Sequence, residues 1–197
     1  MRKYLVCAVL GVTSMFAGIA QAQTATYKID PRHTFVTFEI GHRVGNMDLS
    51  TNRGRWDRKD GTVKFDKVAR TGQVDITLEM ASINTGTEAF DKHLRTADFF
   101  DVEKHPTARF TADRFVFNSD QLAQVVGSLT LMGKVHPLTL HAQRFGCVEN
   151  PMLKREVCGG DFQAVLDRTL FGMEYGIPRG VAKEVRLTLQ VEAILQD

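Results

Sequence analysis

The sequence predicts an all-β domain, a closed antiparallel barrel or a sandwich with one short helix. Apolar and polar residues alternate through most of the chain, which is the pattern of strands with one buried face. Gly, Pro, Asn and Asp separate these runs and mark turns. We count eight or nine adjacent strands without intervening helices, and closing such a sheet would remove its exposed edges.

The amino terminus predicts export. Arg2 and Lys3 precede an uncharged run over residues 4–20, and Ala-Gln-Ala at 20–22 is typical of a signal-peptide cleavage site. We expect residues 1–22 to be a cleaved signal peptide and residues 23–197 to form one domain. A retained transmembrane helix is the alternative interpretation of the same run.

Charge and cysteine content narrow the function classes. Without residues 1–22 the chain carries 23 Lys and Arg against 23 Asp and Glu, so nothing supports nucleic-acid binding. Cys147 and Cys158 remain as an even pair in an exported chain, and we expect a disulfide between them. A pair of metal thiolates is the competing interpretation, but no second Cys pair or nearby His completes four ligands.

The strands can be assigned in order. In residues 34–42, Val36, Phe38 and Ile40 alternate with Thr37 and Glu39, so the first set is expected to face the core. Residues 73–80 and 185–193 repeat this alternation. Further strands are predicted over residues 62–66, 107–117, 124–133, 136–145 and 162–168.

One segment has helical spacing instead. Phe90 and Leu94 lie four residues apart between 87 and 100, which predicts a short helix followed by a turn, with Thr87 as its N-cap. Asp91 and Arg95 are also four apart and are predicted to form an exposed ion pair.

This segment is also rich in His and carboxylate, so two hypotheses compete for it. Such residues can bind metals or move protons, and a hydrolase or isomerase using Asp91 with His93 is one hypothesis. The other is the polar face of a helix that caps the barrel. His105 precedes Pro106 beyond the helix, so we do not expect it to share a metal with His93, and we predict no metal site and no catalytic residue.

Four stretches in this order resemble the YceI-like family of exported, lipocalin-like isoprenoid-binding proteins: HTFVTFEIGH, SINTGTEAFDKHLRTADFFDVEKHPTARF, VGSLTLMGKVHPLTL and DRTLFGM. The resemblance runs over roughly residues 25 to 194. Thr34 stands where a Ser is common in the family, and the loop between the cysteines resembles a disulfide-bearing subgroup. The resemblance implies an antiparallel eight-stranded lipocalin-like barrel with a short capping helix, located in the periplasm.

The resemblance also implies an apolar cavity that holds a polyisoprenoid or a related long-chain amphiphile such as an isoprenoid quinone. We predict that alternating apolar residues form its wall: Val36, Phe38, Ile40, Ile76, Leu78, Phe110, Leu129, Leu131, Leu138, Leu140, Leu187 and Leu189. Six polar residues are candidates for the mouth or lid, where they would bind a ligand head group or fasten the helix to the barrel. They are His33, His42, Asp91, His93, Arg95 and Arg168. His136 and His141 are expected to be exposed, and Trp56 to pack at a barrel end.

The sequence therefore predicts a binding or carrier protein without a cofactor, whose partner is a long-chain lipid. A delivery module that serves a membrane redox protein is compatible with this prediction. The enzyme hypothesis has no support from known catalytic motifs such as H-E-x-x-H or G-x-S-x-G. The sequence does not fix the head group or the length of the ligand. It also leaves the oligomeric state open, and a homodimer is one alternative.

Overall fold

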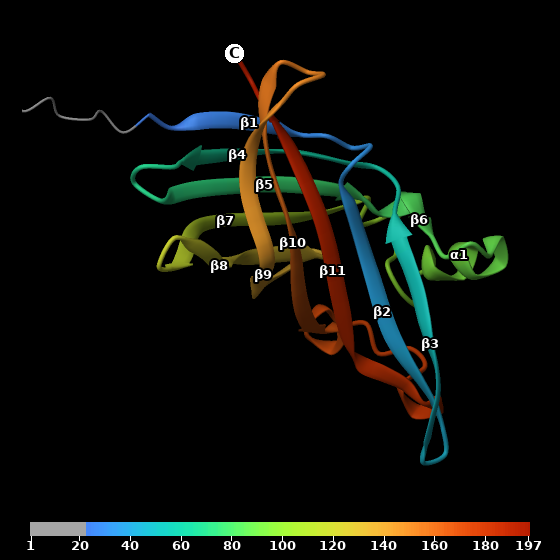
Figure 1. The fold of residues 1–197 in the computed structure, drawn as a ribbon. Helices are drawn as coiled ribbons and strands as arrows, with labels where there is room; N and C mark the ends of the chain where they lie inside the picture. The colour runs from blue at the N-terminus through green and yellow to red at the C-terminus, as the bar shows by residue number, and fades with distance from the viewer. Residues whose placement is uncertain (1–22) are drawn as a thin grey trace, which may run out of the picture.

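The computed structural model describes residues 23–197 (Figure 1). The predicted signal peptide lies outside the described residues. The strands are β1 (Ala25–Ile29), β2 (Phe35–Val44), β3 (Met47–Trp56), β4 (Lys59–Asp66), β5 (Thr71–Glu79), β6 (Ile83–Asn84), β7 (Thr107–Asn118), β8 (Gln121–Leu131), β9 (Lys134–Asn150), β10 (Arg155–Asp167) and β11 (Val181–Leu195). The helix α1 covers Glu88–Leu94, and short 3-10 turns cover Met80–Ser82, Arg168–Phe171 and Ile177–Arg179. Between residues 23 and 197, no helix combines the length and apolar character needed to span a membrane.

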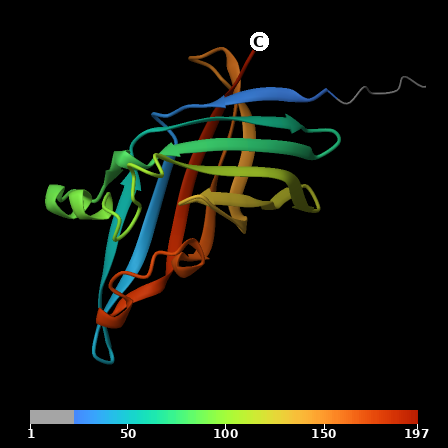
Figure 2. The ribbon, with the colours of Figure 1, turned by 180° about the vertical axis from the view of Figure 1, so that it is seen from behind.

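The predicted eight-stranded antiparallel barrel is confirmed. Neighbouring strands pair in the order β1-β4-β5-β7-β8-β9-β10-β11, and β1 pairs again with β11 to close the ring. Both views show β4, β5, β7 and β8 as one layer that runs across the long strands β9, β10 and β11 (Figures 1 and 2). The core lies between these layers, because the apolar face of each strand points inward.

The sheet continues past the ring on one side. β1 pairs with residues 193–195 of β11, whereas β2 pairs with residues 181–190 of the same strand, so β1 and β2 follow one another along β11. The chain changes course between them at Thr34, whose buried hydroxyl donates to the carbonyl of Glu192 and accepts from its N–H. β3 then pairs with β2, and β6 pairs with β3 at Arg55 and Trp56. This extension leads the chain into α1.

The cross-strand register confirms the predicted inside face of residues 34–42. Val36 lies opposite Leu189, and Phe38 lies opposite Leu187. Val36 and Phe38 are both buried, while Glu39 on the other face forms an exposed ion pair with Arg53. Alternation therefore predicted this strand correctly. It did not predict β1 or β3, and most side chains of β3 are exposed.

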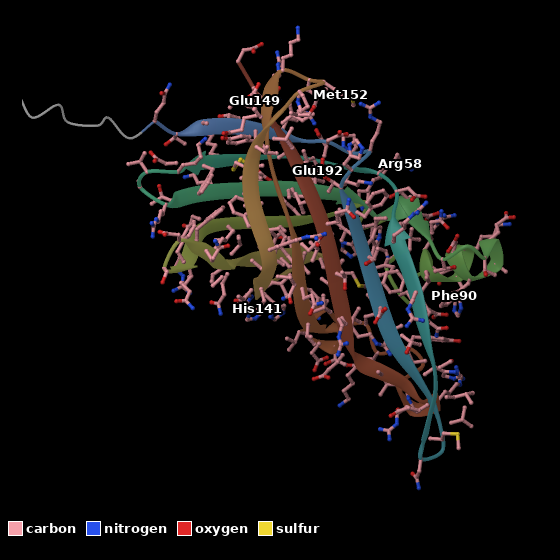
Figure 3. The ribbon with its side chains drawn as sticks, viewed as in Figure 1. Arg58, Phe90, His141, Glu149, Met152 and Glu192 are labelled. Atoms are coloured by element: carbon pink, nitrogen blue, oxygen red, sulfur yellow. A yellow bond between two sulfur atoms is a disulfide. The ribbon has the colours of Figure 1, made fainter. Side chains whose placement is uncertain are left out.

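The structure contains the expected disulfide. Cys147 and Cys158 lie directly opposite one another in the β9–β10 pair, with an S–S distance of 2.01 Å. The Glu156 carboxylate lies close to both sulfur atoms. The three residues resemble a metal site in their spacing, but disulfide sulfurs are not thiolate ligands. Glu149 near the end of β9 and Met152 in the turn that follows lie well away from Phe90 on α1 (Figure 3).

Candidate functional site

The barrel ring encloses an apolar cavity of about 110 Å³. Leu, Val, Ile and Phe side chains from the strands of the ring and from β2 form most of its wall. Tyr27 and Thr34 contribute the hydroxyl groups, and Thr34 uses its hydroxyl on the backbone of β11. One water needs roughly 10–15 Å³ of such space and two or more polar partners, so a cavity of this kind holds hydrocarbon better than water.

Aromatic side chains gather at one end of this cavity. Phe65 stacks on Phe115 and meets the ring of Phe145 edge-on at 5.6 Å between centroids. Tyr27 is almost fully buried beside them and donates its hydroxyl to Glu156. Burial and this hydrogen bond raise the pKa of the Tyr27 phenol well above its ordinary value. This end is therefore apolar inside and is held by one partly buried hydrogen bond.

A second, larger pocket of about 430 Å³ lies under α1. It is lined by Phe38, Ile40, His42, Asn52, Trp56, Phe90, His93, Leu94, Phe99, Phe100, Leu131, Leu166, Arg168, Met173, Tyr175, Val181, Val185 and Leu187. We call this space the outer pocket, and the space inside the ring the inner cavity. Leu187 lines both, so the two are neighbours in the barrel interior. The volume of the outer pocket falls within the range of roughly 300–1,000 Å³ that is common for small-molecule sites.

An aromatic group forms one side of the outer pocket. The indole of Trp56 packs against Phe38 at 5.3 Å and against Phe100 at 5.8 Å between ring centroids. Gly54 on β3 makes room for this group, because a Cβ there would lie 2.6 Å from the Phe38 ring. Trp56 thus packs at a barrel end, as the sequence analysis expected, with only 6% of its surface exposed.

The helix α1 is fastened over the outer pocket by Asp91. This side chain is only 8% exposed, and it accepts hydrogen bonds from the Thr85 N–H at 2.8 Å and the Thr85 hydroxyl at 2.7 Å. The guanidinium of Arg95 donates to the carbonyl of Ile83 at 3.0 Å. The predicted exposed Asp91–Arg95 ion pair is therefore wrong, because each side chain holds the backbone before the helix.

The remaining charged residues of α1, Glu88 and Lys92, lie on its solvent-exposed face. The exposed pair four residues apart is Glu88 with Lys92, at 3.0 Å. Thr87 occupies the N-cap position as predicted, but its side chain makes no capping hydrogen bond. The short helix predicted between residues 87 and 100 is confirmed: it is seven residues long, and turns follow it up to residue 104.

His93 lies on the rim of the outer pocket. Its Nε2 is 3.0 Å from a carboxylate oxygen of Asp98, and its ring meets those of Phe99 and Tyr175 edge-on at 5.1 Å. The hypothesis that paired His93 with Asp91 is not supported by this geometry, because both residues have other partners.

The other histidines named in the sequence analysis lie in different places. His42 lines the outer pocket, as a mouth residue should. His33 lies in the turn between β1 and β2, is exposed, and binds the Asp30 carboxylate at 2.8 Å. It lines neither space, and its assignment to the mouth or lid stays a prediction. His141 is exposed as expected, whereas His136 is half-buried, lies 3.0 Å from the Leu170 carbonyl and packs on Phe171.

Arg168 is the most deeply buried charge near the outer pocket, with 1% of its surface exposed. Its Nε donates to the carbonyl of Ala182 at 2.8 Å, and its two terminal nitrogens donate to those of Met173 and Tyr175 at 3.0 and 2.9 Å. These bonds tie the segment after β10 to the start of β11. Burial lowers the pKa of the guanidinium. Arg168 lines the outer pocket, and the predicted role toward a ligand head group stays a prediction.

Every apolar residue predicted as cavity wall lines one of the two spaces. Val36, Ile76, Leu78, Phe110, Leu129, Leu138, Leu140 and Leu189 line the inner cavity, Phe38, Ile40 and Leu131 line the outer pocket, and Leu187 lines both. Whether a ligand touches them stays a prediction. The sequence analysis missed the aromatic end of the inner cavity and residues such as Asn52, Met173 and Tyr175, which lie in strands or turns without clear alternation.

Comparisons with known proteins agree with this architecture. A family model described as the YceI-like domain matches residues 27–193. A UPF0312 protein of Pseudomonas aeruginosa is 35% identical over 199 residues, covering 100% of both chains. The crystal structure of the Campylobacter jejuni YCEI protein superposes with a TM-score of 0.69 at 23% identity, covering 80% of this chain and 92% of that one.

A further solved structure has a TM-score of 0.61 at 14% identity and covers 88% of this chain and 100% of its own. It is described as a polyisoprenoid binding domain from Saccharophagus degradans implicated in plant cell wall breakdown. At these identities the solved structures establish the fold alone. The family match and the relative from Pseudomonas aeruginosa both span the whole barrel, and the chain therefore belongs to the YceI-like domain family.

Proposed function

We propose that this protein is a periplasmic binding or carrier protein for a polyisoprenoid or a related long-chain amphiphile, such as an isoprenoid quinone. One observation carries the proposal: an apolar inner cavity adjoins a wider outer pocket that contains polar groups. A slender hydrocarbon tail matches the first space, and the head of an amphiphile matches the second.

The energetics favour such a ligand. Each methylene removed from water contributes about 0.8 kcal/mol, so every tail carbon held in the inner cavity offsets part of the cost of ordering a flexible tail. The inner cavity offers nearly continuous Leu, Val, Ile and Phe contact and only the two hydroxyls of Tyr27 and Thr34. Affinity would therefore come from the tail.

Membership of the YceI-like family and the fold shared with a polyisoprenoid binding domain support the ligand class. The predicted signal peptide and the bacterial relatives support the periplasm as the location. If the cargo is a quinone, a membrane redox protein is a suitable recipient. The role proposed is binding and not catalysis, since the Asp91 and His93 side chains are each engaged with other residues.

Native mass spectrometry of the protein purified from its own periplasm tests the proposal. We expect one long-chain lipid per chain, and organic extraction should release it for identification by mass. Protein that is folded, carries no lipid and takes none up from vesicles doped with isoprenoid lipid would contradict the carrier function. Hydrolysis of generic esters by that empty protein would support the enzyme hypothesis instead.

A further inference from the structure

The hairpin of β2 and β3 carries exposed apolar side chains around its turn. Val44 is 56% exposed, Met47 65% and Leu49 58%, and we call these three residues the β2–β3 tip. Val44 and Met47 lie directly opposite one another in the strand register. Both ribbon views show this turn as the outermost point of the molecule on the side away from the carboxyl terminus (Figures 1 and 2). Single exposed apolar residues are ordinary, but a projecting group of them marks a site for a protein or a membrane.

The β2–β3 tip is held in place next to the outer pocket. The Arg43 N–H donates to the carbonyl of Gly180 at 2.8 Å. Gly180 has a φ of 95°, and a Cβ there would collide with the carbonyl oxygen of Arg43, so this close approach requires glycine. A few residues from the tip, His42, Asn52 and Val181 line the outer pocket. A surface that binds the β2–β3 tip therefore also lies close to this pocket.

The small size of the β2–β3 tip fits a lipid bilayer better than a folded protein. A Val, Leu or Met side chain buries at most roughly 120 Å² of apolar surface, so the three together offer at most roughly 360 Å². A specific protein interface takes roughly 800 Å² from each partner and a complementary surface. The boundary between lipid head groups and acyl chains needs no such complementarity, since it accepts apolar side chains and leaves charged ones among the head groups.

The charges that flank the β2–β3 tip fit the same surface. Asp48, between Met47 and Leu49, lies 2.9 Å from the guanidinium of Arg43, so its carboxylate brings no unbalanced charge into the tip. Arg179 is exposed and precedes Gly180, to which the backbone of Arg43 is bonded. Phospholipid head groups present phosphate, which arginine binds well, and phosphatidylethanolamine adds an ammonium group. Head groups of this kind complement charges of both signs.

We propose that the β2–β3 tip inserts into the surface of a phospholipid bilayer and docks the protein there. The inference goes beyond the proposed function and rests on it in one respect, since a carrier of long-chain lipid must meet the membrane that holds its cargo. Docking through this tip brings the outer pocket close to the bilayer. The path of an apolar tail through water, which is unfavourable, is then short.

The β9–β10 hairpin provides a matched control. It also carries three exposed apolar side chains, Val148, Met152 and Leu153, with exposed fractions of 67%, 88% and 43%. Met152 lies well away from Phe90, which lines the outer pocket (Figure 3). The control variant changes all three residues to Ser. If exposed apolar surface alone caused membrane binding, this variant would lose as much binding as one changed at the β2–β3 tip.

The experiment measures co-sedimentation with vesicles of phosphatidylethanolamine and phosphatidylglycerol that contain no isoprenoid. The tip variant combines Val44→Ser, Met47→Ser and Leu49→Ser, at exposed positions where substitution changes stability little. We expect it to bind the vesicles at least about 10-fold more weakly than the wild type, whereas the control variant should bind as the wild type does. A 10-fold loss corresponds to about 1.4 kcal/mol, the burial of about two methylenes, and the three side chains carry more than that.

A dye placed at the tip reports insertion directly. An environment-sensitive fluorophore attached to Met47→Cys should shift its emission to shorter wavelength when the vesicles are added, because it enters an apolar region. The same fluorophore on Met152→Cys should keep its emission unchanged. Each labelled chain differs from the wild type at one exposed position, so this measurement tests the inference even if the tip variant does not fold.

The outcomes separate this inference from the proposed function. Weaker binding of the tip variant alone, with the emission shift at residue 47, supports docking through the β2–β3 tip. The inference is overturned if the wild type does not bind the vesicles, if the control variant loses as much binding as the tip variant, or if the emission at residue 47 does not change. A protein partner is then the remaining occupant of the tip. The carrier function is decided separately, by the lipid that the purified protein contains.

Discussion

The fastening of α1 by Asp91 gives the most direct test of the lid. Replacing Asp91 with Ala removes both hydrogen bonds to Thr85 and leaves the Thr85 N–H without its acceptor. Hydrogen bonds to a charged group contribute about 1.5–3 kcal/mol each, so even the lower value gives about 3 kcal/mol for the pair. Because these contacts are local, the loss should appear as easier opening of residues 85–95 more than as global unfolding.

Hydrogen exchange measures this opening. A loss of about 3 kcal/mol corresponds to roughly 100-fold faster exchange of the α1 amides, since about 1.4 kcal/mol is a factor of ten. Asp91→Asn keeps one acceptor oxygen without the charge and should give an intermediate increase of about 10-fold. Amides in β9 and β10 should exchange as in the wild type.

Glu88→Gln is the control on the same helix. It breaks only the exposed Glu88–Lys92 pair, which contributes at most about 0.5 kcal/mol, and exchange should change by no more than about twofold. If Asp91→Ala leaves the α1 amides as protected as Glu88→Gln does, the buried carboxylate does not hold the lid. If protection falls equally across the whole barrel, the contact belongs to the global fold and the reasoning is also refuted.

Three other predictions concern the body of the barrel. Reduction of the disulfide should lower the melting temperature by about 6–12 °C, because closing its short loop contributes about 3 kcal/mol; free thiols in the unreduced protein would contradict the pairing. Phe38→Asn should place an amide without partners in the pocket wall and cost about 1–3 kcal/mol in folding or binding. The amount of lipid extracted per folded chain should therefore fall in this variant and stay unchanged in Glu39→Gln. Full lipid occupancy in folded Phe38→Asn would show that Phe38 does not contact the ligand. The free energy of unfolding should fall as pH rises above about 10, because tyrosine ionises there in the unfolded chain, whereas burial and Glu156 hold the pKa of Tyr27 higher in the folded protein. Chemical denaturation at several pH values measures this dependence, which should vanish in Tyr27→Phe. An unchanged pH dependence in that variant would exclude Tyr27 as its source.

Alternation of apolar residues predicted the strands that have one buried and one exposed face. The set Val36, Phe38 and Ile40 faces inward as expected, since a strand in a barrel wall must bury every second side chain. β3 was not predicted because it extends past the ring, where most of its side chains meet solvent on both faces. The period-two signal requires one buried face, and this strand has little of one.

The residues of α1 show a second limit of prediction from the sequence. The spacing of Asp91 and Arg95 correctly placed both on a helix, but helical spacing carries no information about which neighbours lie outside the helix. Thr85 and Ile83 precede α1 and lie against it through β6, so their backbone groups take up both side chains. His33 lies in the turn between β1 and β2, which no sequence pattern marked, and there it contacts Asp30. Tertiary neighbours decide the role of a polar residue, whereas the alternation pattern decides which side chains are in the core.

The outer edge of β3 has a consequence for assembly. Within residues 23–197, β3 pairs outward only at Arg55 and Trp56, so the backbone groups of most of this strand face no partner strand. An unpaired edge invites another chain to add a strand. Here the edge carries exposed Asp48 and Arg53, and an incoming strand would need complementary charges beside them. Charge on this edge, which lies outside the closed ring, therefore disfavours the addition of a strand from another chain.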